Sequence, residues 1–152
     1  MLRTITVFLL ALITGTILVS IANTHVVLEG LTGVGAEIPT AVRAEAILDD
    51  LTGFGPVLGI LLLIGFLIAF PVAGFTARLL GPGWRNIGYT LAGGVAVFAI
   101  ISGITLYYNQ MLDSTITPVA SGRNWSGLLV LSLGGAAAGL VFALLKPAAH
   151  TE

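Results

Sequence analysis

The side chains with the greatest chemical potential in this sequence are two histidines and seven acidic residues. His25 and Glu29 are four residues apart, so on a helix they would lie one turn apart and could share a metal ion. A zinc site needs at least three protein ligands, and no third ligand stands nearby. His150 lies near the other end of the chain, on the predicted opposite side of a membrane. We therefore interpret His25 as a solvated residue and predict no bound metal and no cofactor.

Two segments share one pattern: LEGLTGVG at residues 28–35 and LDDLTGFG at residues 48–55. Their acids suggest a cation site, but calcium loops alternate carboxylates and close with a bidentate Glu, which neither segment does. Gly53-Phe-Gly55 also lacks the third glycine and the lysine of a phosphate-binding loop. A glycine after a helix accepts the left-handed conformation and turns the chain. We therefore predict two joints between helices, with solvated acids at Glu29, Asp49 and Asp50 and with these glycines: Gly33, Gly35, Gly53 and Gly55.

Other catalytic and nucleic-acid-binding patterns are missing from the sequence. Ser114, Ser121 and Ser126 have no histidine in the same segment to activate them. The chain has no cysteine, which excludes disulfides and thiolate metal ligands. The net charge is −1 and the six basic residues are scattered singly, so we expect no nucleic-acid partner. The sequence predicts a protein that is not an enzyme.

The composition indicates a membrane protein. Of 152 residues, 57% are hydrophobic and 9% are charged, unlike a soluble domain. Four segments without charge have about the 20 residues that cross the hydrocarbon core. They are residues 4–22, 54–77, 87–108 and 125–145, and longer outer loops at 23–53 and 109–124 connect the first two and the last two. We therefore predict an all-α integral membrane protein in which residues 1–152 form one four-transmembrane-helix bundle.

The distribution of charge sets the expected orientation. Four of the six basic residues flank one side of the predicted spans: Arg3, Arg78, Arg85 and Lys146. By the positive-inside rule, the N and C termini face the cytoplasm. We expect a multi-pass protein of the cell membrane, or of the inner membrane if the source is bacterial. An alternative is that Ser20-Ile-Ala22 ends a cleaved signal peptide, although the apolar run before it is longer than usual.

Residues near and within the spans predict membrane anchoring and helix packing. Aromatic and basic side chains at span ends are typical of membrane interfaces, and the expected anchors are Trp84, Arg85, Tyr107, Tyr108, Arg123 and Trp125. Tyr89 is expected at the interface beside Trp84. Small residues let helix backbones approach closely, and the candidates for such packing are Gly15, Gly103, Gly135 and Gly139. Pro71 predicts a kink in the second span.

The first outer loop contains a further helical pattern. Residues 39–51 begin with Pro and predict a short amphipathic surface helix, whose apolar side would carry Val42, Ala46, Leu48 and Leu51. A separate pattern relates residues 73–82 to residues 138–147, which share Ala-Gly, Leu-Leu and Pro. It supports the hypothesis of a duplicated two-helix hairpin with a parallel pseudo-twofold axis.

These patterns support three hypotheses for function. The first is a non-catalytic accessory or structural subunit, which the small-residue faces favour because they would pack against partner membrane proteins or further copies of the chain. The second is a small oligomeric transporter or channel for a neutral solute, with a path of hydroxyls at Thr14, Thr16, Ser102, Thr105 and Ser132. The third is a protein that holds a lipid, quinone or pigment, with walls from Tyr107, Tyr108 and Trp125. Membrane lipid is an expected partner in all three.

Overall fold

The computed structural model describes residues 2–81, 83–111 and 119–146, and all regular elements in these ranges are helical. They are α1 (Leu2–Gly33), α2 (Thr40–Gly53), α3 (Gly55–Leu80), α4 (Trp84–Met111), the 3-10 helix η1 (Ala120–Arg123) and α5 (Trp125–Leu145). Helices α1, α3, α4 and α5 are long and apolar enough to cross a membrane. The prediction of an all-helical chain with four such helices is confirmed. Its orientation and the hairpin duplication stay predictions. His150 and part of the predicted loop 109–124 lie outside the described residues.

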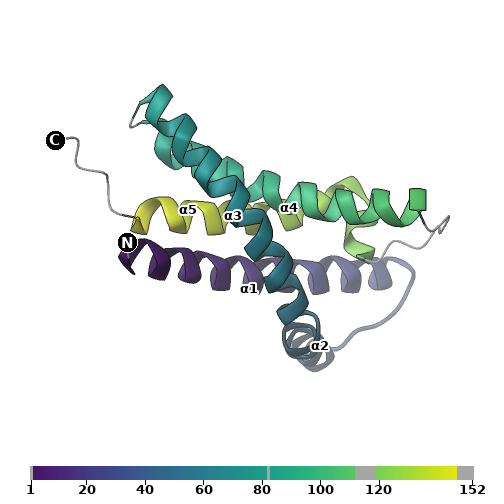
Figure 1. Ribbon diagram of the computed structural model, residues 1–152. Coiled ribbons are helices and arrows are strands. Elements are labelled where there is room, and N and C mark those ends of the chain that lie inside the picture. The colour runs from purple at the N-terminus through teal and green to yellow at the C-terminus, as the bar shows by residue number, and fades with distance from the viewer. Residues whose placement is uncertain (1, 82, 112–118, 147–152) are drawn as a thin grey trace.

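The long helices form a bundle with one oblique member. Helix α5 packs against both α1 and α4, whereas α3 packs against α4 and crosses α1 at a slant (Figure 1). The start of α1, the turn between α3 and α4, and the end of α5 all lie at one end of the bundle (Figure 1). These elements carry the four basic residues that were expected on one side of the membrane. We call this end of the bundle the basic end.

Helix α1 continues well past the predicted span, which stopped at residue 22, and ends at Gly33. Two polar residues of this extension pair at the surface, since His25 Nε2 lies 3.0 Å from Glu29 Oε1 with both side chains exposed. The helix ends in a Schellman motif: the Ala36 N–H donates to the Leu31 carbonyl at 3.1 Å, and Gly35 has a φ of 92°. Gly35 therefore makes the turn that frees the chain for α2.

The junction between α2 and α3 is built without a left-handed glycine. Phe54 stays in the α region, with φ −86° and ψ −30°. The Phe54 N–H donates to the Asp50 carbonyl at 2.9 Å and the Leu58 N–H donates to the Phe54 carbonyl at 3.0 Å, so helical hydrogen bonds bridge the junction. Gly53 and Gly55 are the last residue of α2 and the first of α3. The two LTGxG segments thus end in different conformations although they share four of these five residues.

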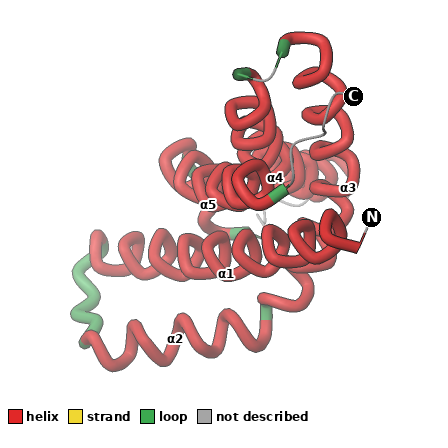
Figure 2. Tube along the Cα trace, turned by 90° about the vertical axis from the view of Figure 1, so that its left-hand side faces the viewer, coloured by secondary structure: helices red, strands yellow, loops and turns green. Residues whose placement is uncertain are grey.

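Helix α2 lies beside the C-terminal half of α1 (Figure 2). It was expected to present Val42, Ala46, Leu48 and Leu51 as one apolar side. In the structure Ala46 and Leu51 are half-buried, whereas Val42 and Leu48 are exposed. The difference arises because Asp50, a polar residue, occupies the inward side and takes its hydrogen-bond partners from α1.

The closest helix contact joins α4 to α5 through glycines. Gly93 of α4 faces Gly135 of α5, where an added Cβ would lie 3.1 Å from the Gly93 carbonyl carbon. A Cβ at Gly139 would lie 2.8 Å from the carbonyl carbon of Tyr89. Only glycine allows two backbones to approach this closely, and such packing holds helices together in lipid. Gly15 performs a similar role in α1, because its Cβ position lies 3.0 Å from Ala138 Cβ.

The fourth predicted packing residue, Gly103, is placed differently. It is exposed on α4, and within the described ranges no atom lies within 4 Å of a Cβ built on it, beyond its own helix and chain neighbours. The bundle as described thus uses Gly93 at the α4–α5 contact, and Gly103 faces outward.

Candidate binding groove

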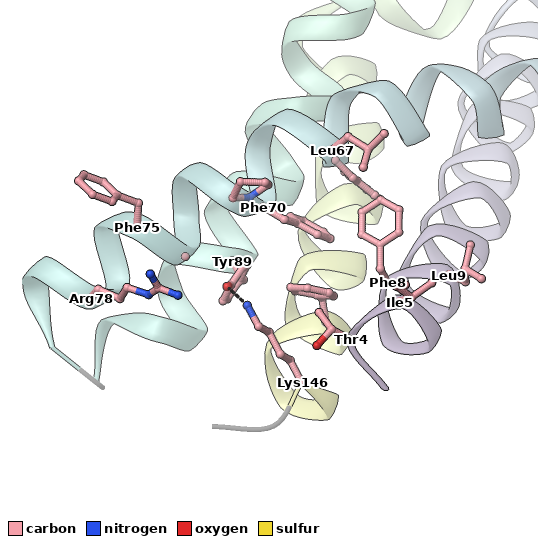
Figure 3. A pocket seen from close by; sticks show the side chains of 14 residues that line it. Thr4, Ile5, Phe8, Leu9, Leu67, Phe70, Phe75, Arg78, Tyr89 and Lys146 are labelled. Atoms are coloured by element: carbon pink, nitrogen blue, oxygen red, sulfur yellow. Dashed lines mark hydrogen bonds between the residues drawn. The ribbon is translucent and has the colours of Figure 1, made fainter. Parts of the chain in front are cut away.

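An apolar groove of about 730 Å³ opens between α1 and α3 near the basic end of the bundle (Figure 3). Its lining comes from the first turns of α1, the second half of α3, one residue of α4 and the end of α5. The lining residues are Thr4, Ile5, Phe8, Leu9, Phe66, Leu67, Phe70, Pro71, Gly74, Phe75, Arg78, Tyr89, Phe142 and Lys146. We call this the α1–α3 groove.

The groove forms because α1 and α3 meet around Gly15 and Thr16 of α1 and then separate toward the basic end. At the crossing, a Cβ on Gly15 would lie 3.1 Å from the Phe66 ring, and one on Gly59 would lie 3.4 Å from Thr16 Oγ1. Small residues on both helices therefore permit close approach at this level. Toward the basic end α3 slants away from α1 (Figure 1). The wedge between the two helices is the groove.

The floor of the groove is a cluster of aromatic rings. Phe70 stacks on Phe66 at 4.7 Å between centroids and on Phe142 at 4.6 Å. Phe8 contacts Phe70 edge-on at 6.0 Å, and Tyr89 contacts Phe142 at 5.0 Å. Offset and edge-to-face arrangements of this kind add to the energy of area burial. The cluster ties four helices together and gives the groove an aromatic, apolar floor.

Two cationic side chains stand where the groove reaches the end of the bundle. Arg78 extends from α3 and Lys146 from the end of α5, on the same side as Thr4 (Figure 3). Lys146 Nζ donates to Tyr89 Oη at 2.7 Å and lies 5.1 Å from the centre of the Tyr89 ring. Within the described ranges, neither cation forms an ion pair with a carboxylate. The groove therefore combines an apolar body with a positively charged end.

Arg85 and Tyr89 hold this cationic end in place. Arg85 Nη2 donates to the Ala143 carbonyl at 2.8 Å and to the Lys146 carbonyl, so α4 caps the last turn of α5. Gly74 leaves room for the Tyr89 hydroxyl, since a Cβ there would lie 2.8 Å from Tyr89 Oη. Tyr89 is itself almost fully buried, although its sequence position predicted the interface. Its ring contributes to the core and its hydroxyl positions Lys146.

The predicted anchors lie at both ends of the bundle. Arg85 and the exposed Trp84 start α4 at the basic end. The exposed residues Tyr107, Tyr108, Arg123 and Trp125 lie toward the end of α4, on η1 and at the start of α5. Tyr107 and Tyr108, which were expected to line a ligand site, thus lie about 27 Å along α4 from Tyr89 of the groove, at 1.5 Å per residue. The groove lies elsewhere.

The hydroxyls proposed for a polar path mostly bond to their own helices. Thr14, Thr16, Thr105 and Ser132 each donate to the carbonyl four residues earlier, at 2.7–2.9 Å. Such a bond satisfies a hydroxyl without any partner from another helix.

A separate polar cluster fixes the other end of the bundle. Asp50 Oδ2 accepts from Asn23 Nδ2 at 3.0 Å and from Thr24 Oγ1 at 2.7 Å. Ser121 Oγ of η1 donates to Asn23 Oδ1 at 2.5 Å. We call these four residues the outer cap. Asp50, expected to be solvated, thus joins α2 to α1, because its position on α2 faces Asn23 and Thr24 rather than water.

The groove residues were not predicted from the sequence, although one signal for them is visible. Phe66, Phe70, Gly74 and Arg78 succeed one another at four-residue spacing, which places them along one side of α3. The two phenylalanines supply the floor, the glycine admits the Tyr89 hydroxyl and the arginine reaches the basic end. Nothing in the local pattern shows that α1 separates from this side.

Comparison with known proteins gives no match: no protein-family model, no curated protein and no solved structure is significantly similar to this chain.

Proposed function

We propose that this chain is a non-catalytic multi-pass protein of the cell membrane that holds the apolar chain of a membrane amphiphile in the α1–α3 groove. The observation that carries the proposal is the groove itself, an aromatic-lined space of about 730 Å³ with two cations at one end. This volume falls within the roughly 300–1,000 Å³ of small-molecule sites, which are also mostly apolar with a few polar groups. The proposal takes up the third hypothesis from the sequence and moves its site to the opposite end of α4.

The ligand is expected to enter from the side rather than from water. Helices α1 and α3 expose large apolar side chains next to the groove, including Leu9 and Leu67. In a membrane these side chains contact lipid tails, so the groove is continuous with the hydrocarbon region. An amphiphile that shares this region can slide in while its polar part stays at the interface.

The test fills the groove and measures what the protein retains. Ile5 lines the groove and is 56% exposed, whereas Ile13 of the same helix is 55% exposed and outside it. Ile5→Trp and Ile13→Trp therefore add the same bulk at equally exposed positions. Each protein is purified in mild detergent, extracted with organic solvent and analysed by mass spectrometry.

We expect about one amphiphile per wild-type chain and per Ile13→Trp chain, and a loss of at least several-fold in Ile5→Trp. Retention of the same amount by both variants would disprove binding in the groove. Absence of any stoichiometric amphiphile from the wild-type protein would do so as well.

A second candidate is an accessory or structural subunit of a membrane assembly, the first hypothesis from the sequence. Helix α2 supports it, because the outer cap fixes this helix and its free side presents exposed Val42 and Leu48 beside Glu45. We propose that this side of α2 contacts the partner protein.

Native mass spectrometry after gentle purification tests the subunit candidate. We expect a defined complex heavier than the 15.6 kDa chain, either with a partner or with further copies. Leu48→Lys should weaken this complex, whereas Glu37→Lys, in the loop before α2, should leave it intact. A monomer alone in every preparation would refute the candidate.

A further inference from the structure

We infer that the amphiphile in the α1–α3 groove is an anionic phospholipid, whose phosphate lies between Arg78 and Lys146 and whose acyl chain lies over the aromatic floor. The inference rests on the proposed function, since it names the class of ligand for the same groove. It is carried by two independent observations, the length of the groove and the charges at its end.

The length of the groove matches one leaflet of a bilayer. Along α3 the lining runs from Phe66 to Arg78, a rise of about 18 Å at 1.5 Å per residue. Half of a hydrocarbon core about 30 Å thick is about 15 Å. The lining therefore begins near the middle of the membrane and ends near its surface, so an acyl chain in the groove has its headgroup beside Arg78.

The charges select an anionic headgroup. Arg78 and Lys146 come from different helices and converge on one end of the groove (Figure 3). An ammonium group has three donors, and Lys146 directs one of them to the Tyr89 hydroxyl, so two remain for a phosphate. Guanidinium donors match phosphate oxygens in pairs. A zwitterionic headgroup brings its own cation toward these side chains, whereas an anionic headgroup does not.

The predicted orientation of the chain agrees with this assignment. The basic end also carries Arg3 and Arg85, and the positive-inside rule places it at the cytoplasmic surface. Anionic lipids in that leaflet attract basic side chains by about 1 kcal/mol each near the surface, which corresponds to roughly a fivefold preference. Two converging cations thus predict a preference of more than tenfold.

The experiment measures lipid preference by native mass spectrometry. Protein stripped of lipid is incubated with equimolar phosphatidylglycerol and phosphatidylcholine of identical acyl chains. The variants are Arg78→Gln, Lys146→Gln and, as a matched control at the other end of the bundle, Arg123→Gln. Lys146→Gln removes the charge but keeps a side chain with hydrogen-bond donors.

We expect the wild type and Arg123→Gln to prefer phosphatidylglycerol by more than tenfold. In Arg78→Gln and in Lys146→Gln this preference should fall by a factor of roughly five, while the total lipid bound stays the same. Equal binding of the two lipids by the wild type would overturn the inference but leave the groove occupied. An unchanged preference in Arg78→Gln and Lys146→Gln would also overturn it. A lack of any lipid in all proteins would instead refute the proposed function.

Discussion

Replacing Gly139 by alanine tests the close packing of α4 on α5. The new Cβ would meet backbone atoms of the other helix, 2.8 Å from the Tyr89 carbonyl carbon and 3.1 Å from Thr90 Cα. Carbon atoms prefer separations of about 3.5–4.0 Å, so the helices must move apart by about 1 Å. A gap of that size forfeits up to about half of the dispersion energy of the contacts it opens. Overpacking of this kind typically costs about 1–3 kcal/mol.

Gly103→Ala is the matched control, because it makes the same chemical change on α4, where no neighbour lies within 4 Å among the described residues. Alanine is favoured over glycine in a helix by about 1 kcal/mol, so this variant should keep or gain stability. Both glycines lie inside helices, so the gain from alanine cancels between the two variants, and their free energies of unfolding should differ by the overpacking cost of about 1–3 kcal/mol. Unfolding in mixed micelles with increasing denaturing detergent measures both. Equal stability of Gly139→Ala and Gly103→Ala would refute the close backbone contact between α4 and α5.

Three further predictions concern single residues at the other end of the bundle and in α1. Asp50→Ala removes the acceptor for two α1 donors in the outer cap, so it should lower the free energy of unfolding by about 1–3 kcal/mol and speed proteolysis of the loop before α2. Asp49→Ala, on the exposed side, should do neither. Equal proteolysis of the two variants would contradict the outer cap. Gly35→Ala forces a side chain into a φ of 92° and should lower stability by about 1–2 kcal/mol in thermal unfolding. Gly33→Ala, inside the helix, should be neutral. A larger loss of stability in Gly33→Ala than in Gly35→Ala would disprove the assigned turn. Ser20→Ala should be neutral or stabilising in the same assay, because the buried Ser20 hydroxyl has no hydrogen-bond partner within the described ranges. A clear loss of stability would show that the hydroxyl has such a partner.

The four long helices could be predicted because their apolar length alone requires helix in a membrane. Their ends were less predictable. Hydropathy falls after Ala22, but α1 continues to Gly33, so the end of the apolar run does not mark the end of the helix. The same limit applies to the two LTGxG segments, where the shared pattern ends in a left-handed turn at Gly35 in one copy and in a continuous helical junction around Phe54 in the other. The conformation of each segment depends on the position of the next helix, which the segment itself does not encode.

The groove could not be predicted because it depends on the angle between two helices. The sequence shows the stripe from Phe66 to Arg78 but not that α3 slants away from α1 along it (Figure 1). Lys146 and Tyr89 meet across 57 residues of chain, and Asp50 meets Thr24 across 26. Such distant pairs are fixed by packing, and no local periodicity reports them.

Photo-crosslinking with a lipid that carries a diazirine in its acyl chain tests the central claim most directly. The protein is reconstituted with this lipid, irradiated and digested, and the adducts are located by mass spectrometry. Occupation of the groove predicts that adducts concentrate in residues 4–9 and 66–78, above the level at Val57, Ile60 and Ile64, which are exposed on α3 but outside the groove lining. Labelling at the same level on all these apolar positions would show that the groove holds no particular lipid.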